Sequence, residues 1–187
     1  MKVLGLSGSL RRESHNTQLL LAAARLFPPD TEFEFFERLK EIPHYDEDDE
    51  PQPNDAVVAL REAIAEADAV LIATPEYNGT MPGHLKTAID WASRPRANPV
   101  LRNKPVAVIG GSTGMFGAVW AQADARKALA TAGARVVEED VPVPAVHEQV
   151  KEDGHVAEEA VEQRLEEVLG ALVQAVRDRE EVRAAAA

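Results

Sequence analysis

The side chains best suited to chemistry gather in a short loop near the start of the chain, and their types suit phosphate binding. The loop follows an apolar run at residues 3–6 and precedes a helical apolar pattern that begins at Leu19. A strand, a small-residue loop and a helix start in this order leave backbone N–H groups free at the positive end of a helix. A phosphate group needs such donors, with hydroxyls, amides and positive charge beside them. The candidate ligands are Ser9, Arg11, Ser14, His15, Asn16 and Thr17.

An ordinary strand-to-helix turn, capped by Ser14 or Asn16 and with its arginines in water, is the alternative interpretation of this loop. The loop lacks the lysine of the G-x-x-x-x-G-K-[ST] phosphate motif. It also lacks the G-x-G-x-x-G spacing, because two residues separate Gly5 from Gly8. A dinucleotide-binding motif is therefore not predicted here.

Composition and charge narrow the class of protein. With 187 residues, we expect one domain over residues 1–187, large enough for a sizeable core. The formal net charge of −12 disfavours a nucleic-acid or anionic-membrane partner, and no apolar stretch is long enough to span a membrane. The absence of cysteine excludes disulfides and thiolate chemistry. The first residues should enter a strand rather than form a signal peptide, so we expect a cytoplasmic protein.

The apolar patterns alternate between strands and helices, which predicts a parallel sheet covered by helices on both faces. Strands that begin at Val3, Ala69 and Val106 are apolar throughout and should be central. Those that begin at Glu32 and Arg135 carry charges and should lie at the edges. This pattern matches a five-stranded sheet of order 2-1-3-4-5, the flavodoxin-like three-layer arrangement of α/β proteins.

The number of strands and the C-terminal segment complete the predicted fold. The rival six-stranded dinucleotide-binding order needs one more strand than the patterns supply. A long amphipathic helix should end the chain, and residues 184–187 should form a frayed tail.

Three unusual loops follow the three central strands, at residues 8–17, 75–83 and 110–117. In an open parallel sheet, ligands bind beyond the carboxyl ends of the strands, near the point where the strand order reverses. We therefore expect the three loops to lie side by side at one edge and to form one binding site.

The second and third loops offer what a flat polar ring needs. Tyr77 would be a ring wall, Asn78 an amide donor and Gly79 a place for close backbone approach, and Ser112 and Thr113 lie among glycines. Each loop alone could be an ordinary connection between elements. A ligand with a phosphate at one end and a flat polar ring at the other would use all three loops, and FMN has this shape.

At these residues the sequence resembles the NADPH-dependent FMN reductase family, which includes bacterial quinone, chromate and azo-dye reductases. Residues 8–16, 75–91 and 110–117 carry the resemblance, and the second segment is the most specific. The resemblance extends over nearly the whole chain to about Val143. The chain departs from the family pattern at His84, where members often have an apolar residue.

The resemblance implies which residues hold the cofactor. It assigns the phosphate to Ser9, Arg11, Ser14, Asn16 and Thr17. It implies an isoalloxazine ring lined by Pro75, Glu76, Tyr77, Asn78 and Gly79. It assigns the pyrimidine side of the ring to Ser112 and its neighbours Gly111, Thr113 and Gly114. Members form dimers or tetramers, so a homodimer or homotetramer with each flavin near a subunit boundary is expected.

The implied activity is that of an NAD(P)H-dependent FMN reductase with a ping-pong mechanism. NADPH or NADH would transfer hydride to flavin N5, and a quinone, azo dye, chromate or free flavin would then take the electrons. Because the flavin carries the chemistry, no catalytic side chain is expected. Asn78 and Gly79 near N5, and Ser112 near N1 and O2, would tune the ring through hydrogen bonds.

Two other classes of protein stay open at this point. A non-catalytic flavodoxin-like electron carrier would share the fold and the phosphate loop, and a nucleotide-binding regulatory domain would lack flavin. No metal is expected, because the histidines show no ligand spacing. The acidic run at residues 46–50 is interpreted as a solvated loop, since its spacing does not match a calcium-binding loop.

Overall fold

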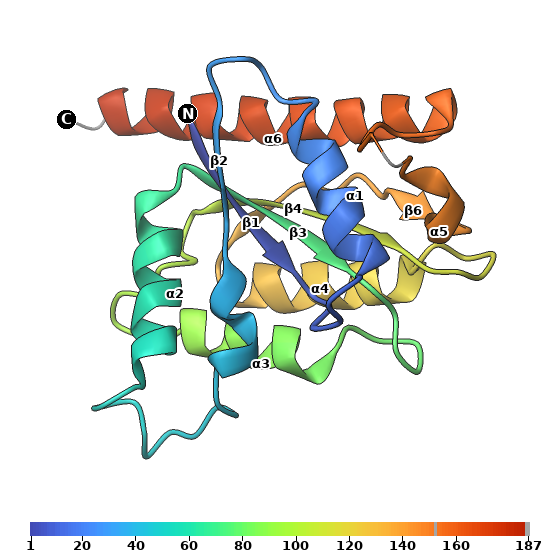
Figure 1. Cartoon of the computed structure of the whole chain (residues 1–187). Coiled ribbons are helices and arrows are strands. Elements are labelled where there is room, and N and C mark those ends of the chain that lie inside the picture. The colour runs from blue at the N-terminus through green and yellow to red at the C-terminus, as the bar shows by residue number, and fades with distance from the viewer. Residues whose placement is uncertain (152, 186–187) are drawn as a thin grey trace.

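A parallel sheet forms the centre of the molecule, as Figure 1 shows for the computed structural model, which describes residues 1–151 and 153–185. The strand order is β2-β1-β3-β4-β5, and β6 also pairs with β4. The predicted flavodoxin-like order 2-1-3-4-5 is therefore confirmed. The strands are β1 (Lys2–Ser7), β2 (Glu32–Phe35), β3 (Ala69–Thr74), β4 (Pro105–Gly111), β5 (Arg135–Val136) and β6 (Pro142–Val143).

The central strands are the ones predicted from their apolar sequences. Every residue of β3 and β4 is buried, and in β1 all but Lys2 are buried. The single edge strand expected at residues 135–143 is split into β5 and β6, which pair with opposite ends of β4. The described sheet thus has six strands rather than five. Charged residues at 138–140 interrupt the strand because they cannot alternate into a buried edge.

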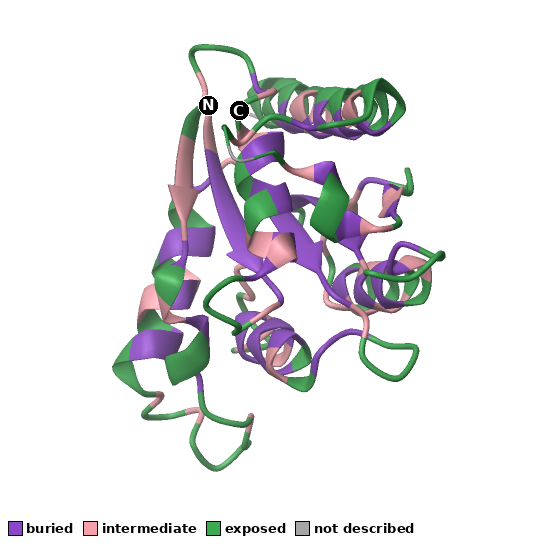
Figure 2. Ribbon diagram, turned by 45° about the vertical axis from the view of Figure 1, so that its right-hand side comes forward, coloured by how far each residue is buried: buried purple, intermediate pink, exposed green. Residues whose placement is uncertain are grey.

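Helices cover both faces of the sheet, and Figure 2 shows buried residues along the strands and on the inner sides of the helices. One face is covered by α2 (Asp55–Glu66), α3 (Gly83–Ala92) and α4 (Val119–Thr131). The other is covered by α1 (His15–Ala24) and the long α6 (Glu159–Ala185). Neighbouring residues of one strand enter different cores, as Leu4 and Val3 do, because side chains alternate across a strand.

Local sequence explains where the early helices begin. The side chain of Ser14 accepts a hydrogen bond from the backbone N of Thr17 and caps α1, and Asn54 caps α2 in the same way. A 3₁₀ helix, η1 (Glu37–Glu41), and a short helix, α5 (Val146–Gln149), were not predicted. Helix α6 is regular through Ala185, and the rest of the expected frayed tail lies outside the described residues.

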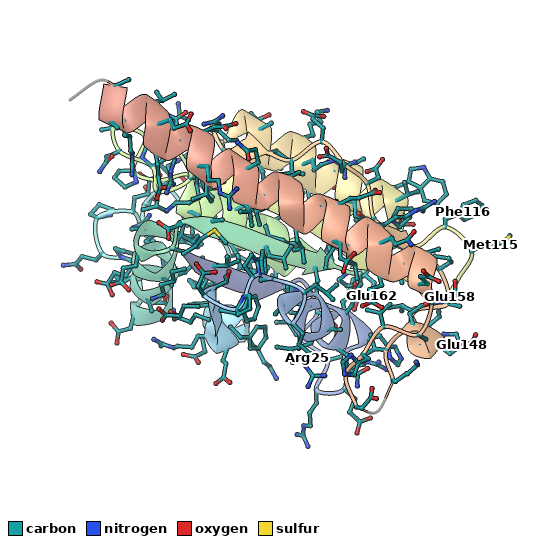
Figure 3. The ribbon with its side chains drawn as sticks, turned by 90° about the horizontal axis from the view of Figure 1, so that it is seen from above. Arg25, Met115, Phe116, Glu148, Glu158 and Glu162 are labelled. Carbon is teal, nitrogen blue, oxygen red and sulfur yellow. The ribbon has the colours of Figure 1, made fainter. Side chains whose placement is uncertain are left out.

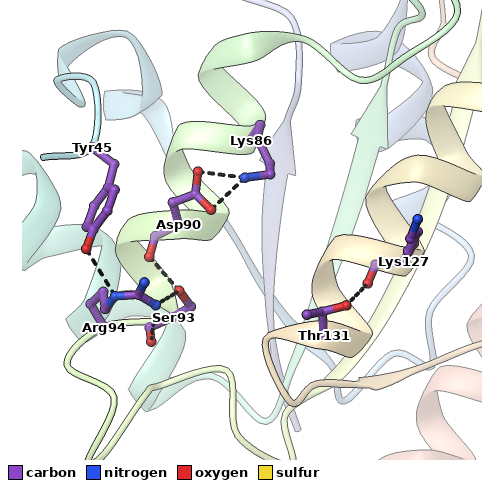
Figure 4. Close-up of polar contacts among 7 residues, drawn as sticks. All are labelled: Tyr45, Lys86, Asp90, Ser93, Arg94, Lys127 and Thr131. Atoms are coloured by element: carbon purple, nitrogen blue, oxygen red, sulfur yellow. Dashed lines mark hydrogen bonds and ion pairs between the residues drawn. The ribbon is translucent and has the colours of Figure 1, made fainter. Parts of the chain in front are cut away.

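Glu50, the last residue of the acidic run at residues 46–50, contacts the segment that follows α3. Glu50 forms an ion pair with Arg94, with 3.0 Å between Oε1 and Nε, and accepts a hydrogen bond from the hydroxyl of Tyr45. Figure 4 shows the contact between Arg94 and Tyr45. The edge of the Tyr45 ring meets the buried ring of Trp91. The last residue of this loop is thus fixed by contacts with Arg94, just after α3, through Tyr45 and Trp91.

Within the described residues, no helix combines the length and the apolar character needed to cross a membrane.

Candidate functional site

The three candidate loops meet at the carboxyl ends of β1, β3 and β4 and enclose a cavity of about 300 Å³. Most of the predicted site residues line it. Those that do are Ser9, Arg11, Ser14, His15, Asn16, Pro75, Glu76, Tyr77, Gly111, Ser112 and Thr113. The predicted Thr17, Asn78, Gly79 and Gly114 lie outside this lining, and Val146 belongs to it without having been predicted.

The first loop places hydroxyls and a guanidinium at the start of α1. Ser14 is both the N-cap of the helix and a buried residue of the cavity wall. Thr17 does not line the cavity; its hydroxyl lies 2.7 Å from that of Ser7 and fixes the end of β1 against the first turn of α1. Arg11 reaches the cavity, whereas the adjacent Arg12 does not line it. Charge, hydroxyls and a helix N-terminus therefore share one end of the cavity, as phosphate binding requires.

Asn16 connects the first loop to the third. Its side-chain Nδ2 donates to the carbonyl O of Gly111 at 2.9 Å, and its Oδ1 accepts from the backbone N of Gly111 at 2.9 Å. Asn16 is almost completely buried. Its amide thus uses one donor and one acceptor on the backbone at the end of β4, and this leaves one N–H donor for a ligand.

The second loop contains a tight turn. Tyr77 and Thr80 exchange backbone hydrogen bonds, with 3.1 Å from Tyr77 N to Thr80 O and 3.3 Å in return. Asn78 and Gly79 between them both have positive φ, 54° and 76°, as in the type I′ turns that favour an Asn-Gly pair. The turn lifts Tyr77 to the mouth of the cavity, where half of its surface is exposed.

The third loop needs a glycine at its start because a short helix packs directly on it. A Cβ added at Gly111 would lie 2.5 Å from Cγ2 of Val146. Val146 begins α5, and its backbone N donates to the carbonyl O of Ser112 at 3.0 Å. Val146 was missed because nothing in the pattern after residue 143 indicated an element that returns to the cavity.

Two histidines contact the loops around the cavity: His15 lines it, and His84 bonds to the first loop from outside the lining. His84, at the start of α3, lies with Nε2 2.9 Å from the carbonyl O of Gly8, so it joins the first loop to α3. Burial lowers the pKa of His84, although the hydrogen bond to Gly8 opposes this. The ring of His15 lies 6.2 Å from that of His147, between centroids. With its proton on Nε2, neutral His84 can donate to the Gly8 carbonyl.

Large exposed hydrophobic side chains lie on the second and third loops and at the start of α4. Among the described residues, the large exposed hydrophobic side chains include Tyr77, Met115, Phe116 and Trp120. The rings of Phe116 and Trp120 lie 4.9 Å apart. Figure 3 shows Met115 and Phe116 at the outer edge of the molecule. Exposed apolar side chains that pack on one another, as Phe116 and Trp120 do, are typical of a surface that meets a ligand or a partner.

The fold defines a flavodoxin-like α/β protein with a cavity at the carboxyl edge of its sheet, where proteins of this fold class bind ligands. The family model for NADPH-dependent FMN reductase matches residues 1–148. The chain therefore belongs to the NADPH-dependent FMN reductase family.

Relatives and solved structures agree with this membership. A NAD(P)H-dependent FMN reductase of Pseudomonas aeruginosa is 48% identical over 130 residues, 69% of each chain. A 2-hydroxy-1,4-benzoquinone reductase of a Burkholderia species is 44% identical over 126 residues, 67% of this chain and 68% of the relative. The structure of the flavoenzyme NAD(P)H:(acceptor) oxidoreductase FerB from Paracoccus denitrificans superimposes with a TM-score of 0.84 at 34% identity, covering 95% of this chain and 97% of FerB.

The protein is thus an FMN-dependent oxidoreductase that uses NAD(P)H, and the alternative of a non-catalytic electron carrier is not supported. The residues of the cavity fit FMN. Ser9, Arg11 and Ser14 carry donor groups that could bind a phosphate, and Pro75 and Tyr77 have flat faces on which a ring could lie. The missing side chain at Gly111 makes room for Val146, so the third loop and α5 can both line the cavity.

Proposed function

We propose that this protein transfers electrons from NAD(P)H to quinone-type acceptors at the cavity between the loops that follow β1, β3 and β4. The observation that carries the proposal is the convergence of a cationic, hydroxyl-rich phosphate end and an aromatic-lined ring end in one cavity. Two similar proteins named as quinone or benzoquinone reductases support the choice of acceptor. Reduction of azo dyes and chromate stays a prediction from the family resemblance.

The proposed roles of the residues follow from their positions. Bound FMN would supply hydride acceptance from NAD(P)H and electron return to an acceptor. Arg11, Ser9 and Ser14 would hold the phosphate, with His15 and Asn16 beside it. Tyr77 would form a ring wall at the mouth, and Pro75 would lie deeper. We assign no side chain to proton transfer.

The predicted residues outside the cavity lining would act through their neighbours. Thr17 would orient Ser7, and Asn78 and Gly79 would shape the turn that carries Tyr77. Gly114, whose carbonyl O accepts from the hydroxyl of Ser112 at 3.3 Å, would hold the third loop in place for the backbone of Ser112 and Thr113.

We also propose that the protein is a homodimer or homotetramer with a subunit contact beside this site. A hollow of about 620 Å³ lies between α3 and α4 and carries both signs of charge, among them Lys86, Asp90 and Lys127; Figure 4 shows these three side chains. A two-fold contact requires such a self-complementary surface. The hollow also includes Asp124, which contacts the loop that carries Tyr77.

Light scattering during gel filtration tests the oligomeric state. We expect at least twice the 20.3 kDa of the chain. Lys127→Glu should weaken the assembly by reversing one charge in the hollow, whereas Lys40→Glu, on the exposed surface of η1, should not. A wild-type mass equal to one chain would contradict the oligomer but leave the proposed reaction unaffected.

Residues 1–187 are proposed to act as one FMN-binding domain in the cytoplasm. NAD(P)H is an intracellular reductant, and its use by this protein supports this location.

A spectrum of the purified protein and a turnover assay test the reaction. After incubation with FMN and removal of excess cofactor, the protein should show bound-flavin absorption. It should then oxidise NADPH steadily when 1,4-benzoquinone is present. A preparation that retains no FMN, or that oxidises NADPH with benzoquinone no faster than free FMN does, would contradict the proposal.

A further inference from the structure

We propose that Glu76 is a positioning residue whose carboxylate holds the N-terminus of α4 and thereby places the third loop against the cofactor cavity. Its Oε2 accepts hydrogen bonds from the backbone N of Trp120 at 3.1 Å and of Ala121 at 3.2 Å. Glu76 follows β3, and α4 follows β4, so these bonds join two of the loops that enclose the cavity. The inference rests on the proposed function only for its effect on FMN.

Helix α4 lacks the cap that most helices carry in their own sequence. Its N-cap residue, Ala118, has a left-handed backbone with φ 59° and no side-chain oxygen, and the first turn has no acidic residue. The N–H groups of Trp120 and Ala121 belong to that first turn, where no intrahelical acceptor is available. Among the described residues, Glu76 is their acceptor. A carboxylate also suits the positive end of a helix.

A second carboxylate joins the same two segments in the opposite direction. Asp124, about one turn further along α4, accepts hydrogen bonds through Oδ2 from the hydroxyl of Thr80 and from the backbone N of Met81, the latter at 3.3 Å. Glu76 thus reaches from the loop to the helix, and Asp124 reaches from the helix to the loop. Two such contacts fix both the position and the direction of α4 relative to the loop that carries Tyr77.

The contacts of Glu76 are transmitted to the cavity because the third loop leads directly into α4. Ser112 and Thr113 line the cavity, and the ring of Phe116 packs on that of Trp120. Displacing the backbone at Trp120 would therefore displace the Phe116 ring and the backbone of the third loop that borders the cavity. With one oxygen bonded to two N–H groups, the Glu76 carboxylate serves as a structural acceptor, not as an acid or base.

Amide hydrogen exchange, resolved by residue with NMR on the FMN-free protein, tests the contact itself. In the wild type, the Trp120 and Ala121 amides should be protected. In Glu76→Ala they should exchange at least about tenfold faster, because no other acceptor replaces the carboxylate. Glu76→Gln retains an acceptor oxygen and should keep most of the protection. Glu62→Ala, which removes an exposed carboxylate from α2, is the matched control. Equal exchange of both amides in the wild type and Glu76→Ala would overturn the proposal.

FMN titration and steady-state kinetics test the positioning role. Glu76→Ala should raise the Kd for FMN about tenfold, in the range of a lost helix cap, and this rise should exceed the fall in kcat at saturating FMN. Glu76→Gln should restore the affinity. A large fall in kcat for both variants with unchanged amide exchange would assign Glu76 to the chemistry instead and overturn the inference. Failure of the wild type to bind FMN would contradict the proposed function, and amide exchange would still decide the role of Glu76.

Discussion

Asn16 and Gly111 exchange two hydrogen bonds of 2.9 Å across 95 positions of the sequence. One side chain at the start of α1 thereby satisfies both backbone groups of the last residue of β4. The contact joins the phosphate end of the cavity to the ring end. Because both partners are buried, neither hydrogen bond can be replaced by water without rearrangement.

Asn16→Ala should lower the free energy of unfolding by about 2–4 kcal/mol, because it leaves a buried N–H and a buried carbonyl without partners. Asn16→Asp keeps the acceptor and should cost less. Urea unfolding measures both changes, with Gln18→Ala on the exposed side of the same helix as the control. A loss below about 0.5 kcal/mol in Asn16→Ala, the range of ordinary surface substitutions, would show that the pair is dispensable.

Arg11→Ala should weaken FMN binding by about tenfold to a hundredfold, the range expected for a charge-assisted hydrogen bond to phosphate. Arg12→Ala removes the same charge from a residue that does not line the cavity, and it should change the affinity less than about threefold. Quenching of FMN fluorescence on titration gives both dissociation constants. Equal effects of the two substitutions would mean that Arg11 acts only through the overall charge of the loop.

Gly79→Ala should destabilise the protein by about 1 kcal/mol, because a left-handed backbone is unfavourable for a residue with a Cβ. An added Cβ would meet no atom within 4 Å, so the cost comes from the φ of 76° alone. Gly83→Ala is the matched control: its Cβ also meets nothing, but it lies in α3 at ordinary φ and should be neutral or slightly stabilising. Thermal unfolding of the two variants distinguishes backbone strain from steric fit.

Lys104 should make stability depend on pH in the alkaline range. Burial lowers the pKa of Lys104 to about 8, against about 10.4 in an unfolded chain. Between these values the unfolded state binds more protons, so the free energy of unfolding should rise as the pH increases from 8 to 10.4 and level off above that. A hydrogen bond holds the ammonium group in this buried place: Lys104 Nζ donates to the carbonyl O of Ala65, at the end of α2, at 3.3 Å.

Comparison of the wild type with Lys104→Met isolates this contribution from other groups that titrate in the same range. The difference in urea midpoint between the two proteins should shift in favour of the wild type from pH 8 to 10.4. A constant difference over that interval would mean that the ammonium group is as well solvated in the folded protein as in the unfolded chain.

The order of the sheet and the meeting of the three candidate loops at one edge were predictable from residue patterns. Apolar runs at β1, β3 and β4 report complete burial, and charges at β2 report an edge, because a charged side chain is costly to bury. Once those strands are central and parallel, the loops after them must share one edge. The convergence of Ser9, Tyr77 and Ser112 on one cavity follows from that topology.

The partners of the polar side chains were decided only by the tertiary structure. The family resemblance implied Glu76 as a ring-lining residue, and the loop residues indicated Asn16 as a phosphate ligand. Neither indicated that Glu76 accepts from the first turn of α4 or that Asn16 bonds to the backbone of Gly111. Val146 reaches the cavity through a short helix that no periodic pattern indicated. Periodicity reports whether a residue is buried, since burial repeats with the local geometry of the chain. Which acceptor a buried donor meets depends on segments many positions away, and only the packed fold brings those segments together.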